Sequence, residues 1–237
     1  MHVLAIHGSP SMKRGKTYLV LERLLKGTQD AGAITEVVFL QEKSIGKCTG
    51  CLTCWTETPG TCVQKDDMAD LIAKLKKTDL MILATPVYVD GMTGSCKNFI
   101  DRLIPLLDPH FEIRNGHLRH VVKEKYCGKV FLVSVCAFSE MDNFDPLVLH
   151  VKRAAKNLNM EYVGEILRPA VYGLSMKKVD ADAIGGILEA FERAGRELVE
   201  NGVVSEKTRQ EAAREIVPKD AYIRALNRYF DSQIQRG

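Results

Sequence analysis

Short apolar runs alternate with amphipathic stretches along most of the chain, and this alternation constrains the fold more than any other feature of the sequence. The apolar runs, which predict buried strands, lie at 3–6, 37–40, 80–84, 130–135 and 162–167. The amphipathic stretches, which predict helices, lie at 16–31, 67–77, 95–107, 146–158 and 183–201. Strands that alternate with helices need crossover connections and therefore form a parallel sheet.

Five such units predict an α/β fold with a flavodoxin-like, doubly wound, five-stranded parallel sheet in the order 2-1-3-4-5. Two segments are additional to this core. An insertion at 109–124 contains Asn115-Gly116 between residues that can pair, which predicts a β-hairpin at 111–120. A C-terminal extension at 205–237 reads as helices interrupted by Pro218. We expect a flavodoxin-like core domain at 1–204, with a Cys-rich loop at 41–66, followed by this extension.

Charge and cysteine content exclude several classes of protein. The 33 basic and 30 acidic residues give a net charge of +3, which is too balanced for a nucleic-acid or membrane-surface protein. No apolar run approaches the ~20 residues of a membrane-spanning helix, and residues 1–8 do not resemble a signal peptide. Seven cysteines, four of them between residues 48 and 62, indicate a cytoplasmic protein with a cofactor or metal site.

The loop after the first strand is suited to an anion. It joins a buried strand to a helix N-terminus, where free N–H groups and the helix dipole favour negative charge. It matches neither G-x-G-x-x-G nor a Walker A loop, so a small phosphomonoester suits it best, and a simple Gly/Ser/Pro turn is the alternative. The candidate binding residues are Ser9, Ser11, Lys13, Arg14, Gly15, Lys16 and Thr17.

Two further loops follow the third and fourth strands and reach the same edge of the sheet, where ligands bind in open α/β folds. The first offers an aromatic ring and a thioether to a flat ligand, and the second would form another wall. Cys136 also fits a buried thiol at a strand end, and Lys97 and Asp101 have the spacing of a surface ion pair on a helix. The candidate residues are Thr85, Pro86, Val87, Tyr88, Gly91, Met92, Cys136, Ala137 and Phe138.

The cysteines form the pattern C-x2-C-x2-C-x7-C, made of Cys48, Cys51, Cys54 and Cys62. Three cysteines at successive x2 spacings favour a [4Fe–4S] cluster. Tetrahedral zinc, four reduced thiols and a disulfide remain alternatives. Because the loop follows the second strand, which neighbours the first, we expect it beside the ligand of the other loops.

These motifs together resemble the NAD(P)H-dependent FMN reductase superfamily, and with the cysteines the chain looks like an iron–sulfur flavoprotein. The resemblance covers about residues 2–170 and implies a flavodoxin-like fold, FMN, a [4Fe–4S] cluster and an oligomer. The residues that carry it are Gly8-Ser9-Pro10, Thr17, Thr85-Pro86-Val87-Tyr88, Gly91, Lys97, Asp101-Arg102, the four cysteines and Asp66-Asp67-Met68.

We therefore expect an FMN-dependent oxidoreductase that passes electrons between FMN and a [4Fe–4S] cluster, with NAD(P)H or a ferredoxin-like protein as donor. The alternatives are a cluster-free NAD(P)H-dependent FMN or quinone reductase, a non-catalytic electron carrier, and a flavin-free, zinc-stabilised module. No general acid or nucleophile constellation is evident in the sequence. We expect a homodimer or homotetramer in which the hairpin, within reach of the flavin rim, contacts a neighbouring subunit; folding back onto its own core is the alternative.

Overall fold

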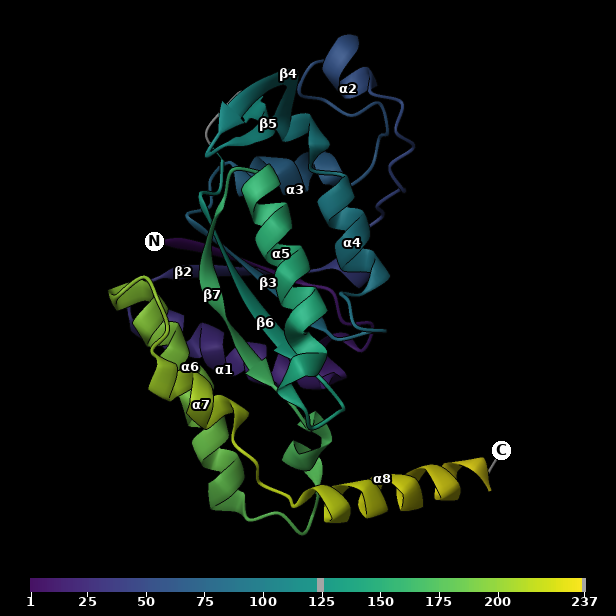
Figure 1. Ribbon diagram of the computed structural model, residues 1–237, viewed down its shortest axis with the longest axis vertical. Helices are drawn as coiled ribbons and strands as arrows, with labels where there is room; N and C mark the ends of the chain where they lie inside the picture. The colour runs from purple at the N-terminus through teal and green to yellow at the C-terminus, as the bar shows by residue number, and fades with distance from the viewer. Residues whose placement is uncertain (123–125, 236–237) are drawn as a thin grey trace.

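The computed structural model describes residues 1–122 and 126–235, and within them a five-stranded parallel sheet lies between two layers of helices (Figure 1). The strand order is β2-β1-β3-β6-β7, which is the predicted 2-1-3-4-5 order with the hairpin strands left out of the count. The flavodoxin-like prediction is thus confirmed. The strands of this sheet are β1 (His2–His7), β2 (Ile34–Phe39), β3 (Leu80–Pro86), β6 (Lys129–Val135) and β7 (Glu161–Arg168).

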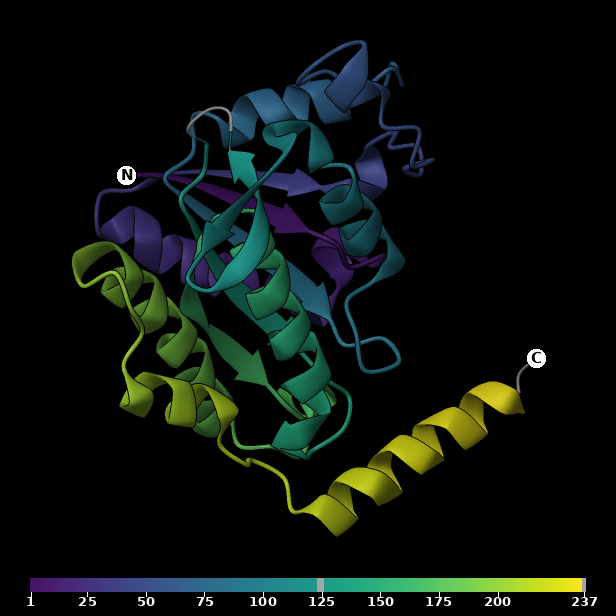
Figure 2. The ribbon, with the colours of Figure 1, turned by 45° about the horizontal axis from the view of Figure 1, so that its top comes forward.

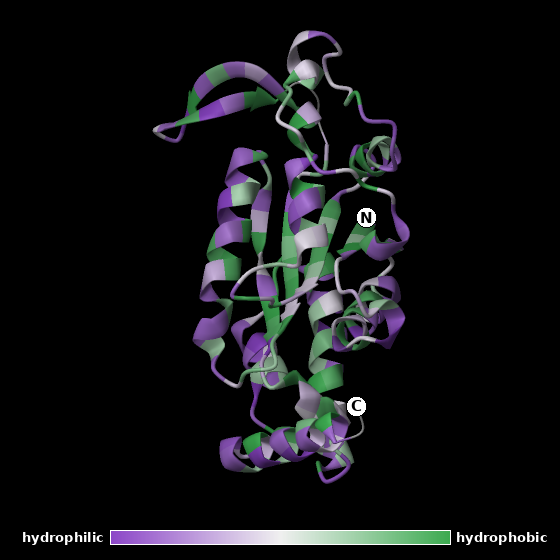
Figure 3. Cartoon of the chain, turned by 90° about the vertical axis from the view of Figure 1, so that its right-hand side faces the viewer, coloured by the Kyte–Doolittle hydropathy of each residue, from purple (hydrophilic) through white to green (hydrophobic). Residues whose placement is uncertain are grey.

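Helices cover both faces of the sheet because its central strands place apolar side chains on both sides. Figure 3 shows these strands largely in green, the colour of hydrophobic residues. Val3 and Ala5 of β1 face the layer of α1 and α6, whereas Leu4 and Ile6 face α3, α4 and α5. The covering helices are α1 (Lys16–Asp30), α3 (Met68–Leu75), α4 (Gly94–Asp101), α5 (Asp145–Asn157) and α6 (Ala181–Glu200). Short 3-10 helices lie at Met12–Arg14, Leu40–Glu42, Ile104–Leu106, Met141–Phe144 and Val171–Ser175.

The predicted helix at 95–107 is too long. Helix α4 ends at Asp101, and the chain continues through a 3-10 helix, Ile104–Leu106, into β4 (Leu107–Arg114). Pro105 accounts for the difference, because proline has no N–H to donate to the carbonyl four residues earlier and its ring clashes with that carbonyl in an α-helix.

The predicted hairpin is present. Strand β4 pairs antiparallel with β5 (His117–Val122), and Asn115 and Gly116 form the turn with φ angles of 52° and 74°. Figure 1 shows the hairpin beyond the ends at which β6 and β7 begin. The expectation that it lies within reach of the flavin rim is therefore wrong in this chain. Helix α4 runs antiparallel to the strands and returns the chain to the opposite edge before the hairpin starts.

The C-terminal extension contains two helices, α7 (Glu206–Ala213) and α8 (Lys219–Ile234), separated at Pro218 as expected. Helix α7 packs against α6 and β7. Helix α8 projects away from the body (Figure 2), and at its base Tyr222 Oη donates a 2.6 Å hydrogen bond to the carbonyl of Ala137. Across residues 1–122 and 126–235, no helix has both the length and the apolarity needed to cross a membrane.

Candidate functional site

A cavity of about 240 Å³, here called the rim cavity, opens at the carboxyl edge of the sheet. The loops after β1, β3 and β6 meet there, as the sequence predicts, and the segment after β7 closes another side. The predicted residues that line it are Ser9, Ser11, Arg14, Gly15, Lys16, Thr17, Pro86, Val87, Tyr88 and Ala137. Three lining residues were not predicted: Val135, Val171 and Tyr172.

One end of the rim cavity is built for an anion. Helix α1 begins here, and no side chain of the described residues caps it. The N–H groups of its first turn are therefore available to a ligand. Arg14 and Lys16 add positive charge. A Cβ at Gly15 would lie 2.9 Å from Ser11 Cβ and 3.2 Å from Ser9 Oγ, so only glycine leaves this cradle open. The arrangement suits a phosphate group.

The other end is apolar and aromatic. Val87 N–H donates to the carbonyl of Val135 at 2.9 Å, which fixes the loop after β3 against the end of β6. Tyr88 is half exposed and starts a tight turn closed by two backbone hydrogen bonds with Gly91. Tyr172 faces the same cavity from the segment after β7. A flat ring fits this end, with Pro86 and Tyr88 on one side and the Ala137 loop on another.

Six predicted residues do not line the rim cavity. The Lys13 ammonium lies over the Phe39 ring, 5.8 Å from its centroid. Thr85 is fully buried and accepts a hydrogen bond from Thr93 N–H, so it fixes the loop after β3 without facing the rim cavity. The others are Gly91, which closes the turn, Met92 and Cys136, which are buried, and Phe138, which is exposed.

The Cys-rich loop is a separate unit whose two ends are tied together. Ser44 N–H donates to Asp67 Oδ2 at 2.7 Å, and Asp67 N–H donates to the Ser44 carbonyl at 3.0 Å. A single short helix, α2 (Thr53–Thr56), lies within it. Trp55 anchors the loop to the hairpin side of the molecule. Its indole Nε1–H donates to the Ile104 carbonyl at 3.1 Å, and its ring contacts that of His120 at a tilt of 45°, with 4.7 Å between the ring centroids.

Arg102 holds the interior of this loop. Its side chain is 1% exposed, and its guanidinium donates to both carboxylate oxygens of Asp66, at 2.6 and 3.0 Å. It also donates to the Gly46 carbonyl at 2.7 Å and to Gln64 Oε1 at 3.2 Å. Burial would raise the pKa of Asp66, but hydrogen bonds from Arg102 and from two backbone N–H groups outweigh it and hold that pKa below its usual value.

All four predicted cysteines line one cavity together with Arg102, whose Nη2 lies 3.4 Å from Cys62 Sγ. The pKa of the Cys54 thiol is raised, first by burial and then by the neighbouring thiols of Cys62, Cys51 and Cys48. Although the raised pKa favours the neutral thiol of Cys54, four sulfur donors on one cavity are the ligand type that an iron–sulfur or zinc group uses. The cavity measures about 20 Å³, roughly the room for one water molecule, and no three potential ligands among the described residues are positioned around a metal. A cluster would therefore require the loop to open.

The two cavities lie at opposite ends of α4. At its N-terminus Thr93 Oγ1 donates to the Gly8 carbonyl of the rim loop at 2.8 Å, whereas Arg102 follows its C-terminus. The eight residues of α4 span about 12 Å. We expected the cysteines beside the rim ligand, and the structure instead separates them, because the Cys-rich loop runs along α4, with Asn98 Nδ2 donating to the Ile45 carbonyl at 2.9 Å.

A flavodoxin-like sheet with an anion cradle and an aromatic wall at its carboxyl edge is an architecture for binding a flavin nucleotide. The chain belongs to the NADPH-dependent FMN reductase family, whose model matches residues 1–138. This confirms the superfamily indicated by the sequence motifs.

Curated relatives include iron–sulfur flavoproteins. One from Archaeoglobus fulgidus is 38% identical over 130 residues, which cover 55% of this chain and 53% of the relative. Another, from Methanocaldococcus jannaschii, is 36% identical over 115 residues, covering 48% of this chain and 58% of the relative. The chain thus spans about half the length of the curated relatives it matches.

Solved structures with the same fold are more distant in sequence. An FMN-dependent NADH-azoreductase from Bacillus anthracis in complex with FMN superposes with a TM-score of 0.62 at 12% identity, covering 84% of this chain and 99% of that one. An NAD(P)H:quinone oxidoreductase from Methanothermobacter marburgensis gives 0.61 at 17% identity, covering 84% and 96%. These matches support the fold.

Proposed function

We propose that this protein is an FMN-dependent oxidoreductase that binds FMN in the rim cavity. The observation that carries the proposal is the joining, in one cavity, of an anion cradle at a helix N-terminus with an aromatic and apolar wall. Membership of the NADPH-dependent FMN reductase family supports the same cofactor.

Each part of the rim cavity has a role in holding FMN. Ser9, Ser11 and Thr17, with the first N–H groups of α1, would bind the phosphate, and Arg14 and Lys16 would balance its charge. The other end would hold the ring between the Tyr88 loop and the Ala137 loop and exclude water from one of its faces.

When bound, FMN supplies the redox chemistry, exchanging electrons either as hydride or one at a time. The residues of the rim cavity would position the flavin. Because Tyr88 is half exposed, an electron donor or acceptor could approach the flavin ring beside it. NAD(P)H is the donor that the family name favours, and a ferredoxin-like protein is the other candidate. Rapid, saturable flavin reduction on stopped-flow mixing with NADH or NADPH would identify a reductase, and its absence would favour an electron carrier.

A titration of the flavin-free protein with FMN and with riboflavin tests the site. FMN should bind at least about tenfold more tightly, because riboflavin lacks the phosphate and so forfeits the charge-assisted hydrogen bonds. Arg14→Gln should weaken FMN binding and leave riboflavin binding unchanged. Lys13→Gln is the matched control, since Lys13 lies over Phe39 outside the cavity. Equal affinity for the two flavins would contradict the proposal.

We further propose that Cys48, Cys51, Cys54 and Cys62 bind a [4Fe–4S] cluster that exchanges electrons with FMN. The proposal is supported by the four thiols on one cavity and by the names of the relatives. Thiolates are the ligands that such clusters need, and loss of one removes a corner of the cube.

Anaerobic reconstitution with iron and sulfide tests the cluster. About four iron atoms per chain should bind, and replacing any one of the four cysteines by Ala should lower the iron content while FMN remains. Cys127→Ala is the matched control, because Cys127 is buried in the core away from the loop. Absence of bound iron would leave the cluster-free FMN or quinone reductase as the function.

A further inference from the structure

A buried arginine outside both cavities lacks a counter-charge. Arg168 ends β7, is 1% exposed, and forms no ion pair within the described residues. Its Nη1 donates to the carbonyls of Ala212 and Arg214, at 3.1 and 2.7 Å, at the C-terminal end of α7. Its Nε is buried without a hydrogen-bond partner in the described structure. A buried charge in this state is costly unless something balances it.

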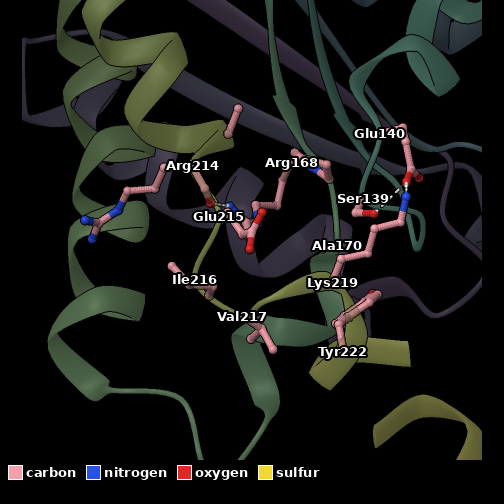
Figure 4. Close-up of a pocket in the computed structure, with 12 residues that line it drawn as sticks. Ser139, Glu140, Arg168, Ala170, Arg214, Glu215, Ile216, Val217, Lys219 and Tyr222 are labelled. Carbon is pink, nitrogen blue, oxygen red and sulfur yellow. Dashed lines mark hydrogen bonds and ion pairs between the residues drawn. The ribbon is translucent and has the colours of Figure 1, made fainter. Parts of the chain in front are cut away.

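Arg168 lines a cavity of about 210 Å³ between the end of β7 and the C-terminal extension (Figure 4). Ile216, Val217 and Tyr222 of the extension form an apolar wall, and Ser139 stands opposite. The volume is below the ~300–1,000 Å³ of pockets that hold drug-sized ligands, so the cavity suits a small group or one end of a larger molecule.

The other charges around this cavity are already paired or lie in water. The Lys219 ammonium forms an ion pair with Glu140. The Arg214 side chain turns away, as Figure 4 shows, and pairs with Glu211 at 3.1 Å. Glu215 is exposed to solvent, which screens its carboxylate. Within this cavity, the Arg168 guanidinium is therefore the charge that no described carboxylate balances. Burial lowers its pKa to about 10, which still leaves it protonated at neutral pH.

We propose that this cavity binds a small oxyanion, a phosphate group or a carboxylate, on the Arg168 guanidinium. The planar fork of arginine binds both kinds of oxyanion through paired hydrogen bonds. The cavity shares its supporting loops with the rim cavity, since Ala137 and Val171 line one while Ser139 and Ala170 line the other. The proposal gives the C-terminal extension a role, because the extension supplies the wall that encloses the anion.

The test follows the Arg168 Nε–H signal by NMR in protein labelled with 15N-arginine and saturated with FMN, so that the rim cavity cannot take up the added anion. The probes are inorganic phosphate and acetate, with NADP⁺ against NAD⁺ to distinguish free phosphate from a nucleotide's additional phosphate. At least one probe should shift the signal saturably, and the probe that does so identifies the source. If none of them moves it, the proposal is wrong.

Two variants separate binding from a structural role of Arg168. Val217→Trp fills the cavity and keeps the arginine, and it should weaken binding of the active probe at least tenfold. Arg209→Gln is the matched control and should leave binding unchanged, since Arg209, on α7, pairs with Glu206 and does not line this cavity. Unchanged binding in Val217→Trp would overturn the proposal. If FMN does not bind, the same titration is made in Arg14→Gln protein, whose rim cavity has lost part of its charge for an added anion. The FMN proposal and the oxyanion proposal can then fail independently.

Discussion

The buried Arg102 side chain holds the Cys-rich loop together, because its guanidinium donates hydrogen bonds to Gly46, Gln64 and Asp66. Arg102→Gln should lower the free energy of unfolding by about 3 kcal/mol, since it leaves the Asp66 carboxylate in place with its partner removed. Lys97→Gln is the control: its ion pair with Asp101 is exposed and contributes less than about 1 kcal/mol. Urea denaturation measures both, and equal losses would contradict this role.

His7 makes stability depend on pH. It is fully buried against Tyr18 and Phe39, its ring nitrogens have no partner in the described structure, and burial lowers its pKa from 6.5 to about 4. Between pH 6.5 and pH 4 the unfolded chain binds a proton that the folded chain does not, so stability falls as the pH falls. The loss between pH 7 and pH 5 should be about 2 kcal/mol.

Urea denaturation at pH 7 and pH 5 measures this loss. His7→Leu should remove most of the pH dependence, whereas His117→Gln, a change at an exposed hairpin residue, should retain it. A pH dependence that persists unchanged in His7→Leu would show that other groups cause it.

At the scale of elements, helices α1 and α6 approach closely through a glycine. A Cβ at Gly195 would lie 2.0 Å from the Leu24 carbonyl oxygen, a backbone atom that cannot move aside. Gly195→Ala should therefore destabilise the protein by about 2 kcal/mol or more. Gly185→Ala, in the same helix and facing open space, should stabilise it by about 0.5–1 kcal/mol. Thermal unfolding compares the two variants, and shifts in the same direction would disprove the close contact.

The elements also show what the sequence could predict. Apolar runs identify the five sheet strands, most clearly the central ones, because burial on both faces leaves a local signal there. Their order was predicted from the five alternating strand–helix units rather than from the runs themselves. The end of α4 was missed because Pro105 acts on backbone geometry rather than on apolar periodicity. The hairpin turn was found from Asn115-Gly116. The hairpin lies at the amino edge of the sheet because α4 runs antiparallel to the strands, and the turn motif holds no information on that direction.

The candidate site shows the same limit. Loops that follow strands were found from their glycines, hydroxyls and charges. Tyr172 was missed although it follows the fifth sheet strand at the same edge, a position that the carboxyl-edge rule includes. Conversely, Lys13 and Met92 have suitable chemistry, and tertiary packing directs one onto Phe39 and the other into the core.

At the scale of the whole molecule, the hairpin presents an apolar face that residues 1–122 and 126–235 cover only in part. The Phe111 ring packs at a tilt against His120, which in turn packs against Trp55 of the Cys-rich loop. The neighbouring cross-strand pair, Ile113 and Leu118, is 81% and 63% exposed. We predict that this pair contacts a second copy of the chain, because exposed apolar side chains grouped on a hairpin favour association.

Light scattering on Ile113→Asp and on Val203→Asp tests this contact. Ile113→Asp should yield a smaller species than the unchanged protein. Val203 is also exposed but lies between α6 and α7, so its substitution should leave assembly intact. If the unsubstituted protein is monomeric, there is no subunit contact. If the Ile113→Asp variant assembles normally, the subunit contact lies elsewhere.

The proposed function requires FMN as the resident flavin of the rim cavity. Acid denaturation of anaerobically purified protein, followed by chromatographic identification of the released flavin, measures this most directly. We predict FMN at about one molecule per chain, since the cradle at the start of α1 is suited to one terminal phosphate. Release mainly of FAD, or a colourless protein that fails to take up added FMN, would contradict the account.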